Sequence, residues 1–391
     1  MQCDYYDAGS CRSCEWMGRP HDEQLADLQR LSAAALARHG DLLWEPPVAG
    51  RESGFRSKAK MVVGGSVEAP TLGILDEHRR GTDLRRCGLL TPRLAAAMPV
   101  LAELVTRARL TPYDVPARRG ELKQLVCLDA GDGPAGDGGL MVRAVLRSTE
   151  AVPRLRRQLP WLTGALAGVG ARLVVLSANL QPLHAALPEG PDEVVLTEAR
   201  TLPVPVGDVV LHLRPQGFVQ TNLEVAGALY RTAAAWVSAL VPAPAVVWDL
   251  YCGAGGFALH LAGPGREVVG VEVSAESVAA ASRSRDERGV PVGGDGSARF
   301  VVGDATALDG SADLPAADLV VVNPPRRGLG DALCAALERS GARHLLYSSC
   351  AVPSLARDLD ALPSWRAVRG RVLDMFPQTA HQEVLVLLER R

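Results

Sequence analysis

Residues 246–261, VVWDLYCGAGGFALHL, constrain the fold of this chain more than any other stretch, because glycines join two different apolar patterns there. A β-branched run ends at Asp249, then Gly253, Gly255 and Gly256 follow, and apolar residues recur at helical spacing beyond them. This pattern predicts a strand, a tight turn and a helix. Glycine permits a positive φ and lets a ligand lie against bare backbone. Taken alone, the stretch is equally well explained as a strand-to-helix turn without a ligand.

The next strand carries an acidic residue where nucleotide-binding sheets use one. Residues 267–273 (EVVGVEV) predict a buried strand, and Glu272 lies near its carboxyl end. A carboxylate at that position can accept hydrogen bonds from ribose hydroxyls. The glycine turn and Glu272 together favour a cofactor that contains a nucleoside. The dinucleotide fingerprint G-x-G-x-x-G is only partly met, because its third glycine is missing from this turn.

Two more apolar strands place polar residues at their carboxyl ends. Residues 300–304 (FVVGD) end in Asp304, and residues 318–328 (DLVVVNPPRRG) bring Asn323 directly after a strand. Open α/β sheets bind ligands at this edge. As a set, the glycine turn, Glu272, Asp304 and the Asn-Pro-Pro segment resemble an S-adenosylmethionine (SAM) methyltransferase domain. The resemblance implies a Rossmann-like α/β domain with SAM as its cofactor.

Length and composition limit the class of protein. At 391 residues the chain has room for two or three domains, at roughly 100–200 residues per domain. A hydrophobic content of 47% and a charged content of 22% are ordinary for a soluble protein. The start MQCDYYDAGSC lacks the features of a signal peptide, and no uninterrupted apolar run is long enough for a membrane span. We therefore expect a cytoplasmic protein, whose eight cysteines serve metal binding or catalysis rather than disulfides.

Three cysteines gather at the start of the chain. Cys3, Cys11 and Cys14 have the spacing C-x7-C-x2-C, and Cys87 follows much later. Four thiolates hold either a zinc ion or an iron–sulfur cluster, and charge alone does not separate these possibilities. Unrelated buried thiols are a poorer explanation, because the stretch is polar. Radical-SAM chemistry is disfavoured, because its C-x3-C-x2-C spacing is absent and a fourth thiolate would leave no open iron. A structural or RNA-positioning site is expected, which ties the first ~90 residues together.

A strand-rich region with scattered arginines follows a predicted helix at residues 22–38. Residues 54–63 (GFRSKAKMVV) predict a strand with an apolar face and a cationic face, the cations being Arg56, Lys58 and Lys60. On an edge strand these cations would form a phosphate-binding surface, and an ordinary solvated face is the alternative. A net charge of −2 excludes a uniformly basic nucleic-acid coat and leaves local patches. Further arginines that extend this region to about residue 200 are Arg118, Arg119, Arg143, Arg147, Arg154, Arg156 and Arg157.

The C-terminal half contributes further polar positions. Gln220 lies in the segment LRPQGFVQTN before a predicted helix, where a capping or solvent role is the alternative to ligand binding. The segment RHLLYSSC predicts the fifth strand, which ends at Cys350 beside the cofactor edge. The closing segment VLDMFPQTAHQEVLVLL predicts a hairpin whose returning strand presents His381 and Glu383 on one face.

Motifs along the whole chain resemble one enzyme family. The segments FVQTN, DLYCGAGGF, VNPPRRG, YSSC and DMFPQTAHQEVL look like those of the RNA uracil-C5 methyltransferases. With the N-terminal cysteines, they are similar to the branch of that family that acts on 23S ribosomal RNA. Two departures are Ala351, where the family often has Asn, and Phe218-Val219, where it often has an aromatic pair. An N-terminal OB-type RNA domain, present in some relatives, is not expected here.

The resemblance implies a set of site residues. It implies a [4Fe–4S] cluster on Cys3, Cys11, Cys14 and Cys87. It implies SAM contacts at Gln220, Tyr251, Glu272 and Asn323, beside the strand-edge positions Gly253, Gly255 and Asp304. It implies Cys350 as the nucleophile and Glu383 as the general base. His381, two residues before Glu383 on the same predicted strand face, is the competing base.

The chemistry explains why these residue types are needed. Uracil C5 is too weak a nucleophile to take a methyl group from a sulfonium unaided. A thiolate that adds to C6 turns the ring into an enolate whose C5 can attack, and a base must then remove the C5 proton so that the thiolate can leave. Cys350 fits the nucleophile, because it ends a strand at the cofactor edge. The other cysteines outside the N-terminal group are expected to be small buried residues, namely Cys127, Cys252 and Cys334.

The predicted substrate is an unstacked uridine in an RNA loop or bulge. Arg326 and Arg327 follow the Asn-Pro-Pro element and suit phosphate or carboxylate contact, whereas amino-group methyltransferases usually have a stacking aromatic residue there. The resemblance implies uridine 747 of 23S ribosomal RNA as the target, no DNA or membrane partner, and a monomeric enzyme. A tRNA or other rRNA uracil-C5 methyltransferase is one alternative. A non-catalytic RNA-binding iron–sulfur protein is another, against which the intact Cys350, Glu383 and glycine turn argue.

Three regions are expected from these patterns. Residues 1–90 form an N-terminal region with the iron–sulfur cluster, residues 91–210 an α+β RNA-recognition domain, and residues 211–391 the SAM-dependent methyltransferase domain. The predicted fold class is α/β for the last region, with an α+β RNA-recognition part before it.

Overall fold

Two compact units make up the chain. The computed structural model describes residues 1–132, 138–185, 187, 189–306 and 314–391. Unit 1 comprises Met1–Cys14, Glu52–Pro205 and Leu213–Gln216, and unit 2 comprises Glu15–Arg51, Val206–His212 and Gly217–Arg391. Each unit has its own large sheet and its own apolar core. Among the described residues, no helix is both long enough and apolar enough to cross a membrane.

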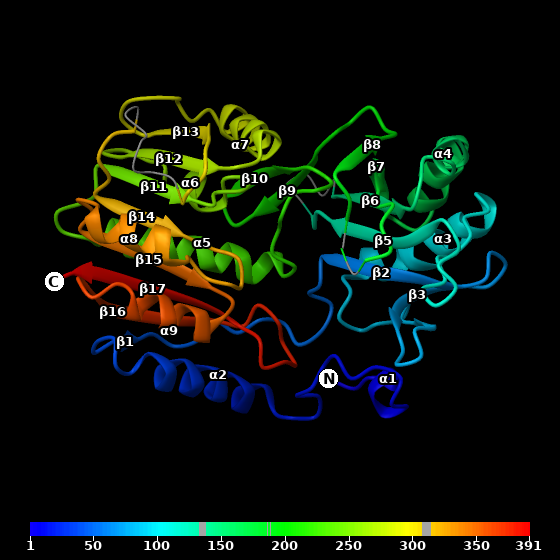
Figure 1. Ribbon diagram of the computed structural model, residues 1–391, viewed down its shortest axis with the longest axis horizontal. Coiled ribbons are helices and arrows are strands. Elements are labelled where there is room, and N and C mark those ends of the chain that lie inside the picture. Colours follow the sequence, from blue (N-terminus) through cyan, green and yellow to red (C-terminus); the bar gives the residue numbers. More distant parts are fainter. Residues whose placement is uncertain (133–137, 186, 188, 307–313) are drawn as a thin grey trace. The chain divides into compact units, whose positions relative to one another are not determined.

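Unit 1 is built on a seven-stranded sheet of order β4-β3-β2-β5-β6-β7-β8 (Figure 1). Neighbouring strands are antiparallel except for the parallel pair β6–β7, which α4 connects. α3 begins where Thr91 accepts a hydrogen bond from the Leu94 N–H, and it packs against β3, β5 and α4. The elements are α1 (Asp4–Asp7), β2 (Lys58–Gly65), β3 (Pro70–Leu75), β4 (Gly81–Asp83), α3 (Pro92–Arg107), β5 (Leu122–Asp129), β6 (Gly139–Leu146), α4 (Val152–Ala167), β7 (Arg172–Leu180) and β8 (Asp192–Val195).

The cationic strand predicted at residues 54–63 is present as β2, but it is not an edge strand. Ala59, Met61 and Val63 are buried while Lys60 is exposed, as the alternation predicts. β2 lies between β3 and β5 and is hydrogen-bonded to both. The sequence pattern could not reveal this position, because β5 is distant along the chain and pairs Lys58 with Leu128.

The two units do not follow the three regions expected from the sequence. Strands β2–β4 from residues 1–90 and β5–β8 from residues 91–210 form a single sheet. Residues Glu15–Arg51 belong to unit 2, where β1 (Leu43–Trp44) pairs in parallel with β16 and α2 (His21–Leu36) packs on α9 and β16. Long-range pairing decides both assignments, and it leaves no local mark in the sequence.

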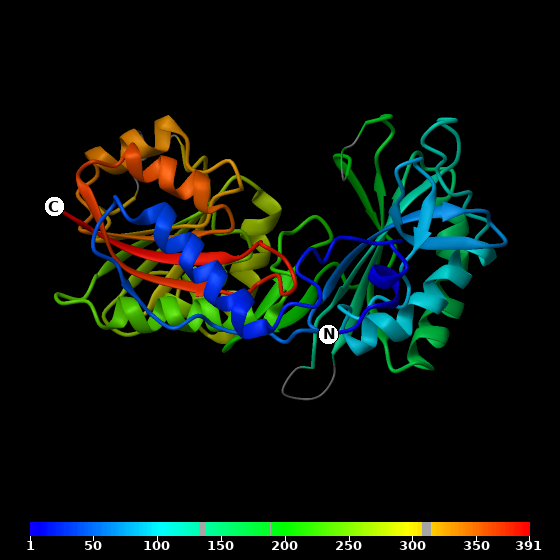
Figure 2. The ribbon, with the colours of Figure 1, turned by 90° about the horizontal axis from the view of Figure 1, so that it is seen from below.

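Unit 2 is built on an eight-stranded sheet of order β1-β16-β17-β15-β14-β11-β12-β13. β11 to β15 run parallel, and β17 is antiparallel to both β15 and β16. Side chains of α2, α8 and α9 share one core with the sheet, and Figure 2 shows α5 on the opposite side of the sheet from α8 and α9.

The strands of the larger sheet in unit 2, besides β1, are β11 (Val246–Leu250), β12 (Glu267–Glu272), β13 (Ser297–Val302), β14 (Leu319–Val322), β15 (His344–Ser349), β16 (Trp365–Leu373) and β17 (Glu383–Arg390). Its helices, besides α2, are α5 (Leu223–Ser238), α6 (Gly256–Leu261), α7 (Ala275–Arg288), α8 (Asp331–Arg339) and α9 (Val352–Asp360). A separate two-stranded sheet contains β9 (Leu202–Val206) and β10 (Val209–Leu213). The α/β class predicted for the C-terminal half is confirmed, and the carboxyl ends of five parallel strands meet at one edge of the sheet.

Candidate active site

The glycine turn leaves open space against its backbone. β11 ends at Leu250, and φ is then positive at Tyr251 (61°), Gly253 (54°) and Gly255 (84°). A Cβ on Gly255 would lie 2.8 Å from the Phe300 ring, whereas a Cβ on Gly253 would have no heavy atom within 4 Å. Packing and backbone conformation therefore both require glycine at position 255. Gly253 leaves its backbone accessible to a ligand.

Glu272 and Asp304 lie at the same edge as this turn. One carboxylate oxygen of Glu272 accepts a hydrogen bond from the Gly253 N–H at 3.2 Å. Asp304 accepts hydrogen bonds from the hydroxyl and N–H of Thr306 at 2.7 and 2.8 Å, and these bonds lower its pKa. Burial, and then the charge of Asp304, raise the pKa of the Tyr251 hydroxyl. The structure thus brings the glycine turn, Glu272, Tyr251 and Asp304 together.

Asp249 is a member of this site that the sequence marked only as the end of a strand. It is 1% exposed, and one oxygen accepts a hydrogen bond from the Ala258 N–H at 2.9 Å, which fixes the start of α6. Its Oδ1 atom is buried and has no hydrogen-bond partner among the described residues. Burial, and to a smaller extent the charge of Glu272, raise the pKa of Asp249 to about 7. A buried acceptor without a partner is costly, so Oδ1 is available to a donor on a ligand.

Cys350 and Glu383 lie where β15 ends and β17 begins. The register of these antiparallel strands pairs Ser349 with Val384. Glu383 is 1% exposed and accepts a hydrogen bond from the Ser348 hydroxyl, and burial raises its pKa to about 7. Cys350 is half-buried, and burial followed by the negative charge of Glu383 raises the pKa of its thiol. A reachable thiol beside a buried carboxylate fits a nucleophile and a base.

His381 is less well placed to be that base. It was expected on the same strand face as Glu383, but β17 begins at Glu383, so His381 lies in the preceding loop. The imidazole is exposed, and its nearest ring neighbour is Phe376 at 6.4 Å between centroids. The geometry therefore favours Glu383 over His381.

The segment that follows Asn323 brings an arginine to Cys350. Asn323 comes directly after β14 and is partly buried. The positive charge of Arg326 and a hydrogen bond from its side chain act to lower the pKa of the Cys350 thiol, against the larger effect of burial. Arg326 thus contacts the proposed nucleophile directly, a role that the sequence did not reveal.

α9 holds this segment in place. The Ser354 hydroxyl donates a hydrogen bond to the Arg326 carbonyl at 2.7 Å. Asp358 is 4% exposed and accepts hydrogen bonds from the Leu329 N–H at 2.8 Å and the Tyr347 hydroxyl at 2.7 Å. The one sequence signal for Asp358 was an acidic residue on the apolar side of a helix. Its contacts depend on three elements that are separate in the sequence.

Tyr230 on α5 links the two parts of the site. Its ring packs edge-on against Phe257 with 4.9 Å between centroids. Burial, and then the charges of Asp249 and Glu383, raise the pKa of its hydroxyl. Asp249, beside the glycine turn, and Glu383, beside Cys350, are therefore both close enough to Tyr230 to affect the pKa of its hydroxyl.

Gln220 and Asn323 are connected less directly to the turn. Gln220 is 5% exposed and lies in the segment before α5, whose N-cap Asn222 accepts a hydrogen bond from the Val225 N–H at 3.3 Å. No hydrogen bond among the described residues joins Gln220 or Asn323 to the glycine turn. Phe218, two positions before Gln220, is 71% exposed.

The four N-terminal cysteines line one cavity in unit 1. Cys3, Cys11, Cys14 and Cys87 all border a cavity of about 170 Å³. Burial, and then the charges of Cys87, Cys11 and Cys3, raise the pKa of the Cys14 thiol to about 11, while Arg56 acts to lower it. In the described parts of the chain, no three His, Cys, Asp or Glu residues are grouped so that they could hold a metal ion. The sulfurs surround a space rather than converge on a point.

The other cysteines match their expected role. Cys127, Cys252 and Cys334 are 0%, 7% and 2% exposed. Burial raises the pKa of each of these thiols. They are therefore small buried side chains whose thiols are held in the neutral form.

Comparison with known domains and structures agrees with this architecture. A family model described as a methyltransferase domain matches residues 247–339, which contain the glycine turn and Asn323 but not Cys350 or Glu383. The crystal structure of the Pyrococcus abyssi tRNA (uracil-54, C5)-methyltransferase with S-adenosyl-L-homocysteine matches with a TM-score of 0.74 and 21% identity. The match covers 96% of this chain and 85% of that one, so the two proteins share a fold.

Curated relatives match the chain from end to end. A protein of Pectobacterium carotovorum subsp. carotovorum (strain PC1) is 44% identical over 393 residues, and one of Serratia proteamaculans (strain 568) is 45% identical over 392 residues. Each match covers 100% of both chains, and both relatives are named 23S rRNA (uracil(747)-C(5))-methyltransferase RlmC. This chain therefore belongs to the RlmC family of 23S rRNA uracil-C5 methyltransferases.

Proposed function

We propose that this protein methylates C5 of uridine 747 in 23S ribosomal RNA and uses SAM as the methyl donor. Full-length relatives at 44–45% identity carry that activity in their names. The observation that carries the proposal is the half-buried Cys350 beside the buried Glu383, within reach of Arg326. This arrangement suits a nucleophile that must add to a ring carbon and later leave.

SAM fits the residues at the glycine turn. The open backbone at Gly253 gives the cofactor a surface to lie on, and the Glu272 carboxylate next to it can accept hydrogen bonds from ribose hydroxyls. The unpartnered Oδ1 atom of Asp249 supplies an acceptor for a charged donor such as an ammonium group. Bound SAM would supply an electrophilic methyl group. Gln220 and Asn323 are proposed to line the same site, toward the methyl group and the substrate.

Cys350, Arg326 and Glu383 account for the steps of the proposed reaction. The Cys350 thiol loses its proton to solvent, the Arg326 guanidinium stabilises the resulting thiolate, and its sulfur forms a bond to C6 of the uracil. Charge then moves to C5 and O4, and C5 takes the methyl group as the S–CH3 bond of the sulfonium breaks and S-adenosyl-L-homocysteine is left. Glu383 removes the proton from C5, the C5–C6 double bond returns, and the C6–sulfur bond breaks to release the thiolate.

The pKa of Glu383 suits this sequence of steps. Burial raises the pKa to about 7, so both the neutral and the ionised carboxyl are populated near neutral pH. The neutral form leaves the neighbouring thiolate without a like charge during attack, and it releases its proton to solvent before the C5 proton is removed. The ionised form is a stronger base than an ordinary carboxylate when the C5 proton must be removed.

A [4Fe–4S] cluster fits the four N-terminal cysteines better than a single zinc ion. Zinc would need all four sulfurs about 2.3 Å from one point. The cysteines instead surround a cavity of about 170 Å³, and Arg56 borders it as a partner for the negative charge of a ligated cluster. The cluster would join Cys3, Cys11 and Cys14 to Cys87 in unit 1. Its proposed role is structural, because holding these segments together organises the RNA-recognition unit.

Mass mapping of ribosomal RNA tests the proposed activity. Methylated uridine at position 747 should be present in cells that contain the protein and absent from cells that lack it. Restoring the gene should return the methyl group, while restoring the Cys350→Ala variant should not. A methyl group missing from transfer RNA instead would assign the substrate to the tRNA alternative. We expect the enzyme to act as a cytoplasmic monomer, which size-exclusion chromatography with light scattering can check for the oligomeric state.

A further inference from the structure

Unit 1 contains a second cavity, apart from the cysteines and outside the catalytic site. Its volume is about 400 Å³, within the range of pockets that hold small ligands. Described side chains of Tyr113, Lys123, His184 and Arg79 border it together with apolar residues of β2 and β3. None of the described lining residues is acidic. The cavity therefore offers aromatic surface and positive charge to a ligand.

Two rings and a lysine make up one wall. The Tyr113 hydroxyl and His184 Nδ1 form a hydrogen bond at 2.9 Å, and their ring centroids are 6.1 Å apart. The Lys123 ammonium lies 4.8 Å from the Tyr113 ring centroid and donates to the Leu183 carbonyl at 2.6 Å and to the Gln181 side chain. An ammonium has three N–H donors, so one remains for a ligand. The wall is thus held in place before any ligand arrives.

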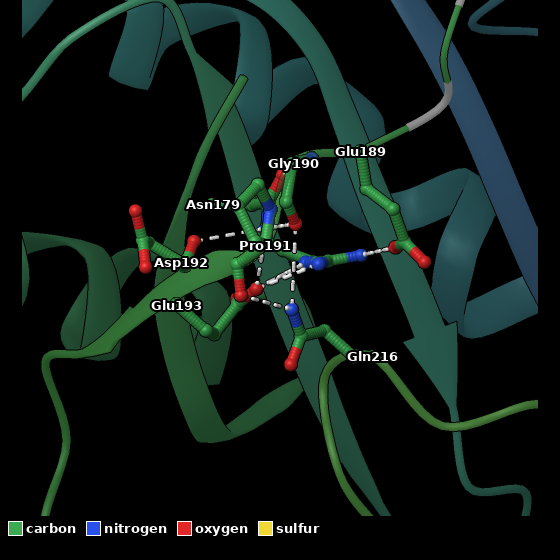
Figure 3. Close-up of polar contacts among 8 residues, drawn as sticks. Asn179, Glu189, Gly190, Pro191, Asp192, Glu193 and Gln216 are labelled. Carbon is green, nitrogen blue, oxygen red and sulfur yellow. Dashed lines mark hydrogen bonds and ion pairs between the residues drawn. The ribbon is translucent and has the colours of Figure 1, made fainter. Parts of the chain in front are cut away.

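Near this cavity in the sequence, an ion-pair network joins Arg143 of β6 to Glu189 and to Glu193 of β8 (Figure 3). Arg143 is 3% exposed and donates hydrogen bonds to both oxygens of Glu193 at 2.9 and 3.0 Å, and it also pairs with Glu189. The Asn179 amide donates to the Gly190 carbonyl at 3.0 Å and accepts from the Gly190 N–H at 2.7 Å. Arg143 was counted among the sequence's RNA-binding candidates, but these contacts make it a structural residue that pairs with Glu189 and Glu193.

Two further polar side chains of the cavity, Gln124 and Arg79, have atoms without a hydrogen-bond or ion-pair partner among the described residues. The Gln124 Oε1 atom is buried and accepts no hydrogen bond from any described residue. The Arg79 side chain is exposed and pairs with no acidic group in the described chain. An unpaired acceptor inside and a cation at the rim suit a ligand with N–H donors and a negative charge.

We propose that this cavity binds an unstacked nucleotide of the substrate RNA other than the target uridine. A nucleobase supplies a ring to stack on Tyr113 or His184, and its Watson–Crick edge supplies N–H donors for Gln124. The adjoining phosphates supply negative charge for Arg79 and Lys123. This inference rests on the proposed function, because it assumes a loop RNA as substrate, and it adds a point in unit 1 at which that loop is recognised, besides the target uridine at Cys350.

Fluorescence anisotropy with a labelled RNA hairpin that contains the target loop tests this inference on the full-length protein. Tyr113→Ala should raise the Kd by about 10- to 100-fold, the loss expected when one base loses its aromatic partner. Tyr113→Phe keeps the ring and should bind nearly as wild type. Arg79→Ala should lower the slope of log Kd against log salt by about 0.7, the value for one lost contact to a single-stranded phosphate. Arg107→Ala, at an exposed arginine of α3 that does not line the cavity, should bind with a wild-type Kd at the working salt concentration.

The outcomes separate this inference from the proposed function. Wild-type RNA affinity in Tyr113→Ala, with methylation intact, would refute the nucleotide subsite and leave the methyltransferase assignment standing. Tight binding of uridine or adenosine monophosphate that the hairpin cannot displace would also refute it, because the ligand would then be a free nucleotide. Loss of binding in Tyr113→Phe as large as in Tyr113→Ala would refute ring stacking. A wild-type protein that methylates no uridine would refute the proposed function, whatever the cavity binds.

Discussion

Two regions of this protein use half-buried cysteines beside an arginine, and their surroundings give them different chemistry. In unit 2, burial raises the pKa of Cys350, Arg326 acts to lower it, and the neighbour is the carboxyl of Glu383. In unit 1, burial raises the pKa of Cys87 and Arg56 acts to lower it, but the neighbours are other thiols. A lone thiol next to a base can bond to a substrate and leave again. Four thiols around a cavity are suited to remain bound to a metal centre.

The largest expected effect comes from removing one sulfur from each region. Cys350→Ala should abolish methyl transfer and the covalent RNA complex while the iron–sulfur absorbance of anaerobically prepared protein stays. Cys87→Ala should lose that absorbance and lower the melting temperature, because the proposed cluster would no longer join the segments of unit 1. Optical spectra, iron and sulfide analysis and labelled-SAM assays measure both results. Cys127→Ala, in the core of unit 1, is the matched control that should keep the absorbance. One zinc per chain and no sulfide in the wild type would contradict the cluster.

Replacement of the proposed base, Glu383, should have the next largest effect. Glu383→Gln leaves nucleophilic attack and methyl transfer possible but removes the acceptor for the C5 proton, so turnover should fall by about 10²- to 10⁴-fold. A methylated RNA should stay attached to Cys350 and survive a denaturing gel with labelled SAM. His381→Ala should not trap this adduct, because its imidazole is exposed in the loop before β17. Free methylated RNA released by Glu383→Gln at the normal rate would show that Glu383 is not the base.

The raised pKa of Glu383 also predicts a pH-dependent stability. Its folded-state pKa is about 7 against an ordinary value of 4.5, so the folded protein binds the proton more tightly than the unfolded chain. Stability is therefore greatest below pH 4.5 for this group alone, falls as the pH rises to about 7, and then levels off. The loss is about 3 kcal/mol, from the distance between the two pKa values.

Urea unfolding at pH 5 and pH 8 measures this loss by comparing the wild type with Glu383→Gln. The variant cannot ionise at this position, so its stability should fall by about 2.5 kcal/mol less between the two pH values, because the unfolded chain is already mostly ionised there at pH 5. Asp249 has its pKa raised to about 7 as well, and because it stays in both proteins its contribution cancels in the comparison. Equal pH dependence in the two proteins would mean that Glu383 ionises freely in the fold.

Cofactor affinity should change by a smaller factor. Glu272→Ala removes the carboxylate at the glycine turn and should weaken SAM binding by about 1.5–3 kcal/mol, roughly 10- to 100-fold, as expected for hydrogen bonds to a charged group. Calorimetry with SAM and S-adenosyl-L-homocysteine measures the change. Glu276→Ala, on the first turn of α7, is the matched control and should bind SAM as the wild type does. An unchanged affinity in Glu272→Ala would remove this residue from the cofactor site.

The sequence predicted one of the two regions more completely than the other. Strand ends of unit 2 were predictable, because short apolar runs there stop at Glu272, Asp304 and Cys350 and parallel strands bring such ends together. The position of β2 in the middle of its sheet was not predictable, because its pairing with β5 is formed by residues far along the chain.

The supporting contacts of the site could not be predicted either, because they also join residues that are far apart in the chain. Asp358 acts through Leu329 and Tyr347, which belong to other elements, and its role depends on how α9 packs. The sequence gives no reason to separate Arg143 from the other arginines of its region. Its role depends on Glu193 of β8, to which it donates a hydrogen bond in the folded protein. Local patterns report which residues are polar and at what spacing. They do not report which distant group each polar residue meets.

The smallest effects are expected from replacing Arg326 and Arg56. These variants test whether each arginine lowers the pKa of the thiols in its own unit only. Arg326→Ala removes a charge and a hydrogen bond that favour the Cys350 thiolate, so the pKa of this thiol should rise further. Iodoacetamide should then alkylate Cys350 more slowly, by a few-fold at pH 8, with the rate profile moved to higher pH. Arg326→Lys should recover part of the rate, because it restores the charge without the planar guanidinium.

Arg56→Ala should leave Cys350 alkylation unchanged, because the Arg56 charge acts on the thiols of unit 1. Peptide mass mapping of the alkylated protein assigns each rate to its cysteine. Equal Cys350 rates in wild type and Arg326→Ala would mean that the guanidinium does not stabilise the thiolate, and Arg326 would then be left with a role in binding RNA phosphate. A slower Cys350 rate in Arg56→Ala would mean that the two regions are coupled, so that the cysteine cavity influences the nucleophile rather than only the fold of unit 1.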